Sequence, residues 1–440
     1  MSFCALGAYS QNRSAYFSDN YIYGFQLNPA FASETGFISM PGIGNLNIAV
    51  DGNVGINKFL FNTNGRTTTF MNPEISASEF LKGLKTNNRI GANGRIGILT
   101  VGFNAFGGFN TISLNTVFDV QARMPKSVFS FLKEGVQNRT YDISNLDAHA
   151  DAYVELALNH SHKINDRLRV GAAVKLLVGG GNIDVNMNSA KLVLGENAWT
   201  AETDARVLAN FKGLAYKTEI NDRTGHEYIS GVSLDGPKGI GGIGLAFDLG
   251  AVYKLNQDWT FSAAFTDIGF ISWSNNMEAS TNGVHTFNTD DYIFDPDDFG
   301  STWDVMGDRL SALYELEDNG DTGRRNRALS ATMNAGAEYV FPLYRPLSFG
   351  VLNTTRIAGR FSWTDFRLSA TVKPVKCLSA SVNYGIGTFG SSFGWVANLS
   401  LTGFNLFIGM DHTVGKLAKQ GVPLNSDAQF SLGINFPFGK

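Results

Sequence analysis

The last stretch of the chain, residues 427–438, alternates between apolar side chains and small or polar ones. Its apolar positions are Ala428, Phe430, Leu432, Ile434, Phe436 and Phe438. A β-strand points successive side chains to opposite faces, so this stretch has one apolar face and one polar face. The same alternation recurs through most of the chain. Repeated two-sided strands are typical of a transmembrane β-barrel. A soluble all-β protein also alternates in this way and remains the alternative.

Fourteen stretches show this pattern. They are 45–56, 94–106, 110–121, 149–163, 167–178, 243–254, 258–268, 329–341, 347–358, 366–374, 377–386, 393–402, 404–413 and 427–438. Their lengths suit the ~9–11 residues that a tilted strand needs to cross a bilayer. Short turns alternate with longer segments, and both ends of the series fall on the short-turn side. This parity predicts an all-β antiparallel barrel with periplasmic ends and long outer loops.

Composition favours the membrane interpretation. Charged residues make up 17% of the 440 residues, below the ~25% of a soluble domain. Aromatic residues recur near strand ends, as in an interfacial girdle; they are Trp259, Trp273, Trp363, Trp395, Tyr253 and Tyr384. The net charge of −4 without basic clusters argues against nucleic acid as a partner. No apolar run reaches the ~18 residues of a transmembrane helix.

Residues 1–10 resemble the end of a signal peptide. Ala8-Tyr9-Ser10 forms a small-x-small cleavage site with Gln11 as the mature start. The basic region that should precede them is missing, so we expect a true start codon further upstream and export to the bacterial outer membrane. An ordinary apolar N-terminal segment is the alternative. The two cysteines, Cys4 and Cys377, have no disulfide or zinc spacing.

The irregular parts of the chain have separate predictions. Residues 11–44 lack periodicity and contain Asn28, Pro29 and Ala30. The long outer loops are 179–242, which we expect to extend strands beyond the membrane, and 269–328. Helical spacing predicts helices at 73–84, 126–136 and 297–317. The last of these could cap the barrel mouth or bind a partner, or it could pack on its own barrel.

Charged residues on the polar strand faces are predicted to point into the lumen. They are Asp151, Glu155, Arg167, Arg169, Lys175, Asp248, Lys254, Arg367, Lys373 and Asp411. No nucleophile–base motif is present, so we expect no catalytic residue, no cofactor and no metal. Two patterns in the sequence resemble metal sites. His160 and His162 are interpreted as an interfacial pair. The acidic cluster Asp290, Asp291, Asp295, Asp297, Asp298, Asp318 and Asp321 leaves calcium open.

The closing strand also carries an assembly pattern. Ser431, Gly433, Phe436 and Phe438 follow a polar-x-Gly-x-x-aromatic-x-aromatic spacing. This resembles the signal that the barrel-assembly machinery reads, although two further residues follow Phe438. Coincidence in a Phe-rich chain is the alternative.

Three stretches together resemble the FadL-type outer-membrane barrels, and more specifically a Bacteroidota barrel family of unassigned function. They are Asn28-Pro29-Ala30, Leu168-x-Val170-Gly171-x-x-x-Lys175, and Asp248–Asn256 continuing into Trp259–Gly269. The resemblance implies fourteen strands. It also implies that residues 11–44 fold into the lumen as a plug, with residues 45–438 forming the barrel.

The resemblance further implies passive transport of hydrophobic small molecules that leave sideways through the barrel wall. The alternative is a scaffold barrel that binds protein partners of a secretion or surface-assembly machinery. The expected partners are outer-membrane lipid, the assembly machinery, and a hydrophobic small molecule or a protein at the outer loops.

Overall fold

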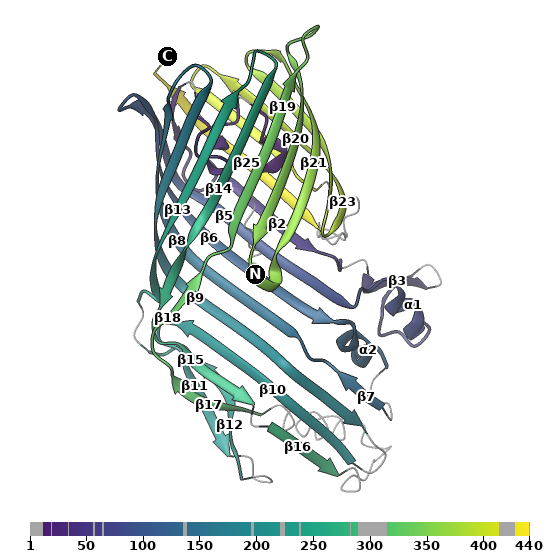
Figure 1. The fold of residues 1–440 in the computed structure, drawn as a ribbon. Helices are drawn as coiled ribbons and strands as arrows, with labels where there is room; N and C mark the ends of the chain where they lie inside the picture. Colours follow the sequence, from purple (N-terminus) through teal and green to yellow (C-terminus); the bar gives the residue numbers. More distant parts are fainter. Residues whose placement is uncertain are drawn as a thin grey trace.

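The chain forms one long antiparallel sheet that closes into a barrel and continues beyond one side of its mouth (Figure 1). This description comes from a computed structural model. It covers residues 12–18, 20–33, 35–55, 58–63, 66–134, 139–194, 198–220, 225–236, 239–281, 283–288, 315–412 and 427–439.

The barrel wall is a ring of fourteen antiparallel strands, as predicted. β1 (Gly36–Ser39) and β2 (Leu46–Gly52) together make the first strand. The others, in ring order, are β5 (Asn87–Ala105), β6 (Gly108–Pro125), β8 (Leu146–Lys163), β9 (Leu168–Leu194), β13 (Gly242–Lys254), β14 (Trp259–Trp273), β19 (Ala331–Val340), β20 (Leu347–Ile357), β21 (Trp363–Val375), β22 (Leu378–Gly387), β23 (Gly390–Leu401), β24 (Phe404–Met410) and β25 (Ala428–Phe438). β25 pairs with both β1 and β2, which closes the ring and leaves the wall without a free edge.

The wall begins earlier in the chain than predicted. The first strand was expected to start at residue 45, but β1 already pairs with β25 and β5 from Gly36 onward. β9 also runs on to Leu194, sixteen residues beyond the predicted end at 178. Both differences arise because the alternation weakens at these places while the backbone pairing continues.

The outer face of the wall is apolar and its inner face is polar, which is the reverse of a soluble protein. On β9, Val174 and Leu176 are 43% and 53% exposed, whereas Lys175 between them is 4% exposed. An apolar outer face with polar side chains inside is the arrangement of a barrel surrounded by lipid. Of the predicted girdle, Tyr253 and Trp259 are exposed near the short turns, where Trp259 packs on Tyr339 with ring centroids 4.9 Å apart. Trp273 was wrongly placed in this girdle, because its side chain is buried inside the barrel.

At the opposite end, here called the long-loop end, only one side of the wall continues (Figure 1). The strands there are β7 (Arg139–Asp142), β10 (Ala198–Phe211), β15 (Met277–Thr281), β16 (Gly283–Asn288), β17 (Leu316–Asp321) and β18 (Arg325–Ala328). Two separate hairpins are β3 (Leu60–Thr63) with β4 (Arg66–Thr69), and β11 (Ala215–Ile220) with β12 (Glu227–Ser233). The strand extension expected in 179–242 is therefore present.

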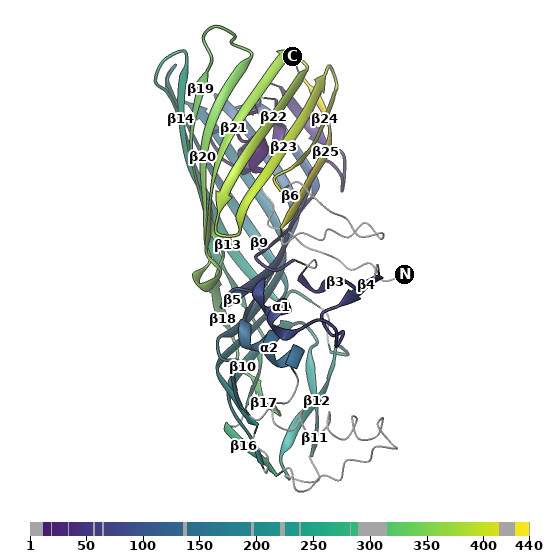
Figure 2. The same cartoon turned by 90° about the vertical axis from the view of Figure 1, so that its right-hand side faces the viewer.

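Two short α-helices lie side by side at the mouth (Figure 2). α1 (Ala77–Lys82) begins after Ser76, whose side chain accepts a bond from Glu79 N, and α2 (Lys126–Glu134) follows β6. Both helices fall within the predicted ranges and share an apolar cluster that includes Phe80 and Phe129. The predicted helix at 297–317 lies mostly outside the described residues. Its last two positions belong to strand β17 and are therefore not helical. Among the described residues no helix is long and apolar enough to cross a membrane.

Candidate functional site: the luminal plug

The segment before β1 lies inside the barrel and forms a plug (Figure 1, purple). It contains two short 3-10 helices, η1 (Arg13–Ala15) and η2 (Ile22–Gln26). Its apolar side chains form one buried cluster with wall residues. The plug contributes Ala15, Tyr16, Tyr21, Ile22, Tyr23, Phe25 and Leu27, and the wall contributes Phe37, Phe109, Leu352, Val396 and Phe407. The plug is therefore held by apolar burial as well as by the polar contacts below.

The Asn28-Pro29-Ala30 turn is the neutral anchor of this plug. Asn28 Nδ2 donates to the carbonyl oxygens of Ala251 and Ala263 at 3.2 and 3.3 Å, while Asn28 Oδ1 accepts from Ala30 N at 2.9 Å. Wall side chains in turn donate to the carbonyls of the plug: Asn334 to Leu27 at 2.9 Å, Asn159 to Pro29 at 3.4 Å and Ser161 to Ala30 at 2.8 Å. These bonds pair polar groups that would be costly to bury alone.

Glycines on the inner face of the wall leave room for this turn. A Cβ at Gly250 would collide with Asn28 Oδ1, and one at Gly171 would collide with the carbonyl of Pro29. Further glycines face the rest of the plug in the same way, namely Gly336, Gly350 and Gly394. Part of the high glycine content therefore serves close approach of the plug to the wall.

The start of the plug is its charged anchor. Arg13 Nε donates to Asp411 Oδ2 at 2.9 Å, and Arg13 Nη1 donates to Asp365 Oδ2 at 3.2 Å. Asp411 also accepts from the backbone N–H groups of Arg13 and Ser14, at 2.9 and 2.7 Å. Arg367 joins the same network: its Nε donates to Asp365 Oδ2 at 2.6 Å and its Nη1 donates to the backbone carbonyl of Asp411 at 2.9 Å. Charge-assisted bonds of this kind are stronger than neutral ones.

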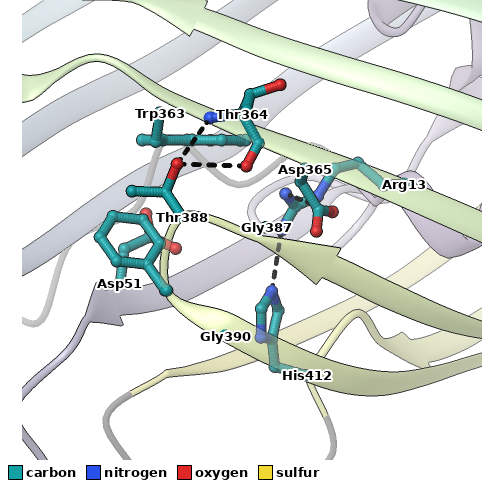
Figure 3. A pocket seen from close by; sticks show the side chains of 10 residues that line it. Arg13, Asp51, Trp363, Thr364, Asp365, Gly387, Thr388, Gly390 and His412 are labelled. Atoms are coloured by element: carbon teal, nitrogen blue, oxygen red, sulfur yellow. Dashed lines mark hydrogen bonds and ion pairs between the residues drawn. The ribbon is translucent and has the colours of Figure 1, made fainter.

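A small pocket opens beside the charged anchor (Figure 3). It holds about 260 Å³ of empty space, counted out into open solvent, and is lined by Arg13, Asp51, Trp363, Thr364, Asp365, Gly387, Thr388, Phe389, Gly390 and His412. The Arg13 guanidinium lies 5.0 Å from the ring centroid of Trp363, within range of a cation–π contact. Arg13 therefore connects the plug to a small pocket at the edge of the charged anchor.

Two more ionic layers lie in the lumen on the long-loop side of the plug. In the first, Lys175 Nζ lies 2.7 Å from Asp248 and 2.6 Å from Asp267, and Arg95 pairs with Glu155. In the second, Arg356 of β20 pairs with Asp119 of β6. These two strands are not neighbours in the ring, so this bond crosses the lumen. Among the described residues the interior therefore holds paired charges as well as the plug.

The predicted lumen-facing charges fall into two groups. Asp151, Glu155, Lys175, Asp248, Arg367 and Asp411 are buried in these networks. Arg167, Arg169, Lys254 and Lys373 lie at or near the short-turn end, where Arg167 and Lys254 are exposed and the other two are half-buried. The side chains that sequence reasoning missed include Arg13, Arg95, Asp119, Asp267, Arg356 and His412. Of these, Arg95 shares a strand face with other polar residues and could have been found by its alternation.

The predicted assembly residues all lie in β25. Ser431 is buried and accepts a bond from Asn12 Nδ2 at 2.7 Å, and Gly433 packs against Phe407. Phe436 and Phe438 are exposed on the outer face. This placement is compatible with an assembly signal, which stays a prediction.

The structure describes the histidine pair completely and the acidic cluster only in part. The rings of His160 and His162 are 5.7 Å apart, and His160 Nδ1 bonds to Asn110 Oδ1 at 2.9 Å. Asp318 and Asp321 lie in β17, whereas the acidic residues between 290 and 298 lie outside the described residues. No group of three or more potential metal ligands occurs in the part of the chain that the structure describes.

A closed antiparallel barrel with an apolar outer face and a polar, plugged interior defines an outer-membrane β-barrel. More specifically, the chain belongs to the DUF5723 family, a family of unknown function, whose model matches residues 29–411. No curated protein matches the chain.

Several solved outer-membrane barrels are similar at low identity. The toluene transporter TbuX of Ralstonia pickettii shares 9% identity at a TM-score of 0.42, over 94% of this chain and 92% of that one. The toluene transporter TodX of Pseudomonas putida shares 11% identity at 0.41, over 98% and 95%. A FadL homologue of Pseudomonas aeruginosa shares 11% identity at 0.40, over 98% and 96%.

Proposed function

We propose that the protein passes hydrophobic small molecules passively, by a lateral route through the barrel wall beside the plug. The observation that carries the proposal is a break in the first wall strand. β1 pairs with β25 as far as Ser39↔Asn435, and regular pairing resumes only at Leu46↔Leu432. The residues between, 40–45, leave the regular pairing and form a looped bulge in the wall. This loop keeps backbone bonds to both neighbouring strands, at Ile434 of β25 and at Gly97 of β5.

The outer side of this loop is apolar. Met40 and Ile43 are 37% and 38% exposed, next to the outward-facing Phe436. Gly42 between them has φ +78°, a left-handed conformation that glycine adopts without strain. A hydrophobic molecule that left the barrel here would pass directly into lipid, which favours its transfer out of water.

The inner side of the loop is bonded to the plug. Asn45 Nδ2 donates to Gln26 Oε1 at 2.9 Å. The Tyr23 hydroxyl donates to Asn435 Oδ1 at 2.8 Å, and Asn435 Nδ2 donates to the Gly44 carbonyl at 3.3 Å. Burial raises the pKa of Tyr23, so its hydroxyl keeps the donated proton. A plug that shifts would therefore remove support from the loop.

Aromatic rings surround these bonds and give the cargo an apolar place to bind. Tyr23 lies 5.8 Å from Phe37 and 5.9 Å from Phe407, and Tyr21 lies 4.9 Å from Phe407, between ring centroids. A hydrophobic cargo would replace some of these ring contacts as it displaces the plug. Its entry into the wall follows from apolar transfer alone and needs no catalysis.

Uptake of a hydrophobic fluorescent probe into proteoliposomes tests this proposal. Tyr23→Phe removes the bond to Asn435, and we expect uptake to rise about two- to tenfold, because a neutral hydrogen bond contributes ~0.5–1.5 kcal/mol. Tyr216→Phe is the control, because its hydroxyl bonds to the Met277 carbonyl in the strands beyond the mouth, away from the plug. Equal uptake by the native protein and both variants would argue against a plug-controlled lateral route.

A scaffold function is the second candidate, favoured by the one-sided continuation of the wall. β9 and β10 reach far beyond the mouth, whereas β22 and β23 are joined by a two-residue turn at 388–389. Such a projecting sheet offers a large surface to a protein partner of a secretion or surface-assembly machinery. Crosslinking in intact outer membranes tests it, and recovery of the barrel alone would oppose this function.

We further propose that the protein is exported through a signal peptide and inserted by the barrel-assembly machinery. The exposed Phe436 and Phe438 are the residues that the machinery would read. Replacing both by Ala should lower the amount of heat-modifiable, folded barrel in the membrane. Unchanged abundance and migration would remove the assembly role and leave the fold unaffected.

A further inference from the structure

We propose that His412 is a proton-sensitive latch that holds the start of the plug in its closed position. The inference concerns regulation and rests on the proposed function, because only a barrel that opens needs a latch. It follows from the contacts of one buried imidazole at the edge of the pocket in Figure 3.

Two guanidinium groups meet the same nitrogen of this ring. Arg13 Nη2 and Arg367 Nη2 each lie 3.1 Å from His412 Nε2, one from the plug and one from the wall strand β21. The other ring nitrogen, Nδ1, bonds to the carboxylate of Asp427, just before β25. His412 therefore ties the plug to two parts of the wall.

These contacts assign the protonation of the ring. A guanidinium can only donate hydrogen bonds, so Nε2 has to accept. The proton then sits on Nδ1 and is donated to Asp427, and the imidazole is neutral in the closed state. A second proton on Nε2 would place a third donor against two guanidinium groups, and both bonds would be lost.

Other charges face the latch from each element around it. Asp365 of β21 and Asp411 after β24 accept from Arg13, and Asp51 of β2 lines the same pocket. These carboxylates favour a protonated ring, whereas the two arginines oppose it. When acid brings the proton, the ring can keep its bond to Asp427 only by moving away from Arg13 and Arg367. Arg13 then loses one of its three wall partners, and the plug loosens at its start.

The pocket lies directly beside the latch. His412 lines it together with Arg13, so the ring lies beside a partly open space large enough for a water molecule. His149, which bonds to Asp119 of the second ionic layer, is a suitable control for a buried histidine away from the plug. It is also buried, but its Nε2 lies 3.1 Å from Asp119 and it has no contact with the plug among the described residues.

Cysteine accessibility tests the latch without any cargo. Ala15, which is buried in the plug, is replaced by Cys in a full-length protein whose Cys4 and Cys377 are Ser. Maleimide labelling in proteoliposomes is divided by that of an exposed Asn165→Cys reporter, which removes the intrinsic effect of pH on thiol reactivity. The ratio is measured between about pH 7.5 and about pH 5, the range in which histidine changes charge.

We expect the ratio to rise about tenfold or more on acidification, as for the loss of hydrogen bonds to a charged group. His412→Gln keeps an acceptor at the position of Nε2 but cannot be protonated, so its ratio should stay flat. His149→Gln should behave like the native protein. A flat ratio in the native background, or an equal rise in His412→Gln, would overturn the latch. Neither result decides transport, which the uptake assay tests separately.

Discussion

The two anchors of the plug use different chemistry to reach the same wall. At Asn28 the bonds are neutral, made by amides and carbonyls packed against Gly250 and Gly171. At Arg13 the bonds are charged and lie beside a pocket open to solvent. Neutral anchors in a tight glycine seat do not respond to pH, whereas a charged anchor next to a histidine does. We therefore expect the plug to stay fixed at Asn28 and to be released at Arg13.

The largest effect is expected where a buried charge loses its partner. Asp411→Ala removes the carboxylate that accepts from Arg13 and from two backbone N–H groups, and breaking a buried pair typically costs ~3–5 kcal/mol. We expect the Ala15→Cys label to become fully accessible while the barrel still migrates as folded. Asp166→Ala, which removes only an exposed pair with Lys163, is the control. A protected label in Asp411→Ala would contradict the role of the charged anchor.

A side chain at Gly250 should weaken the neutral anchor at Asn28. Gly250→Val would collide with Asn28, and overpacking of this kind costs ~1–3 kcal/mol. We expect protease sensitivity near Asn28 with the start of the plug still protected. Ala251→Val, one residue along the same strand, points to the opposite face and should leave the plug in place. Equal sensitivity of the two variants would show that the seat is not specific.

An effect of similar size is expected from loss of the neutral bonds alone. Asn28→Ala leaves the carbonyls of Ala251 and Ala263 without their donor, at a cost of ~1–3 kcal/mol. Hydrogen exchange of the turn should speed up by a similar factor at about pH 7.5 and about pH 5, because no titrating group is involved. Asn20→Ala, which removes a single exposed bond to the Lys376 carbonyl, serves as control. A strong pH dependence of the exchange rate in Asn28→Ala would contradict the claim that only the charged anchor responds to pH.

The wall could be predicted from the sequence, and most of the plug contacts could not. The alternation of apolar and polar residues within each wall strand identifies its two faces, as in β25 between Ala428 and Phe438. The contact between Arg13 and Asp411 joins residues 398 positions apart, and the segment around Arg13 has no periodicity. Its position in the lumen was expected only because residues 28–30 resemble a known plug motif.

The predicted lumen charges show a second limit. Lys175 and Lys254 both lie on the polar face of a strand, yet Lys175 is buried between carboxylates and Lys254 is exposed at the end of β13. Period-two alternation gives the face of a residue but not its height in the barrel. Residues near the rim therefore share the pattern of luminal residues and still meet solvent.

A reversible disulfide between the plug and the wall tests whether movement of the plug opens the barrel. Ser18 Oγ of the plug and Ser379 Oγ of β22 lie 3.0 Å apart, so the Ser18→Cys, Ser379→Cys pair is close enough for a disulfide once Cys377 is replaced by Ser. We expect proteoliposomes to take up a hydrophobic probe only when this disulfide is reduced, and we expect oxidation to stop the uptake. Equal uptake by the oxidised and reduced protein would contradict the claim that movement of the plug opens the barrel.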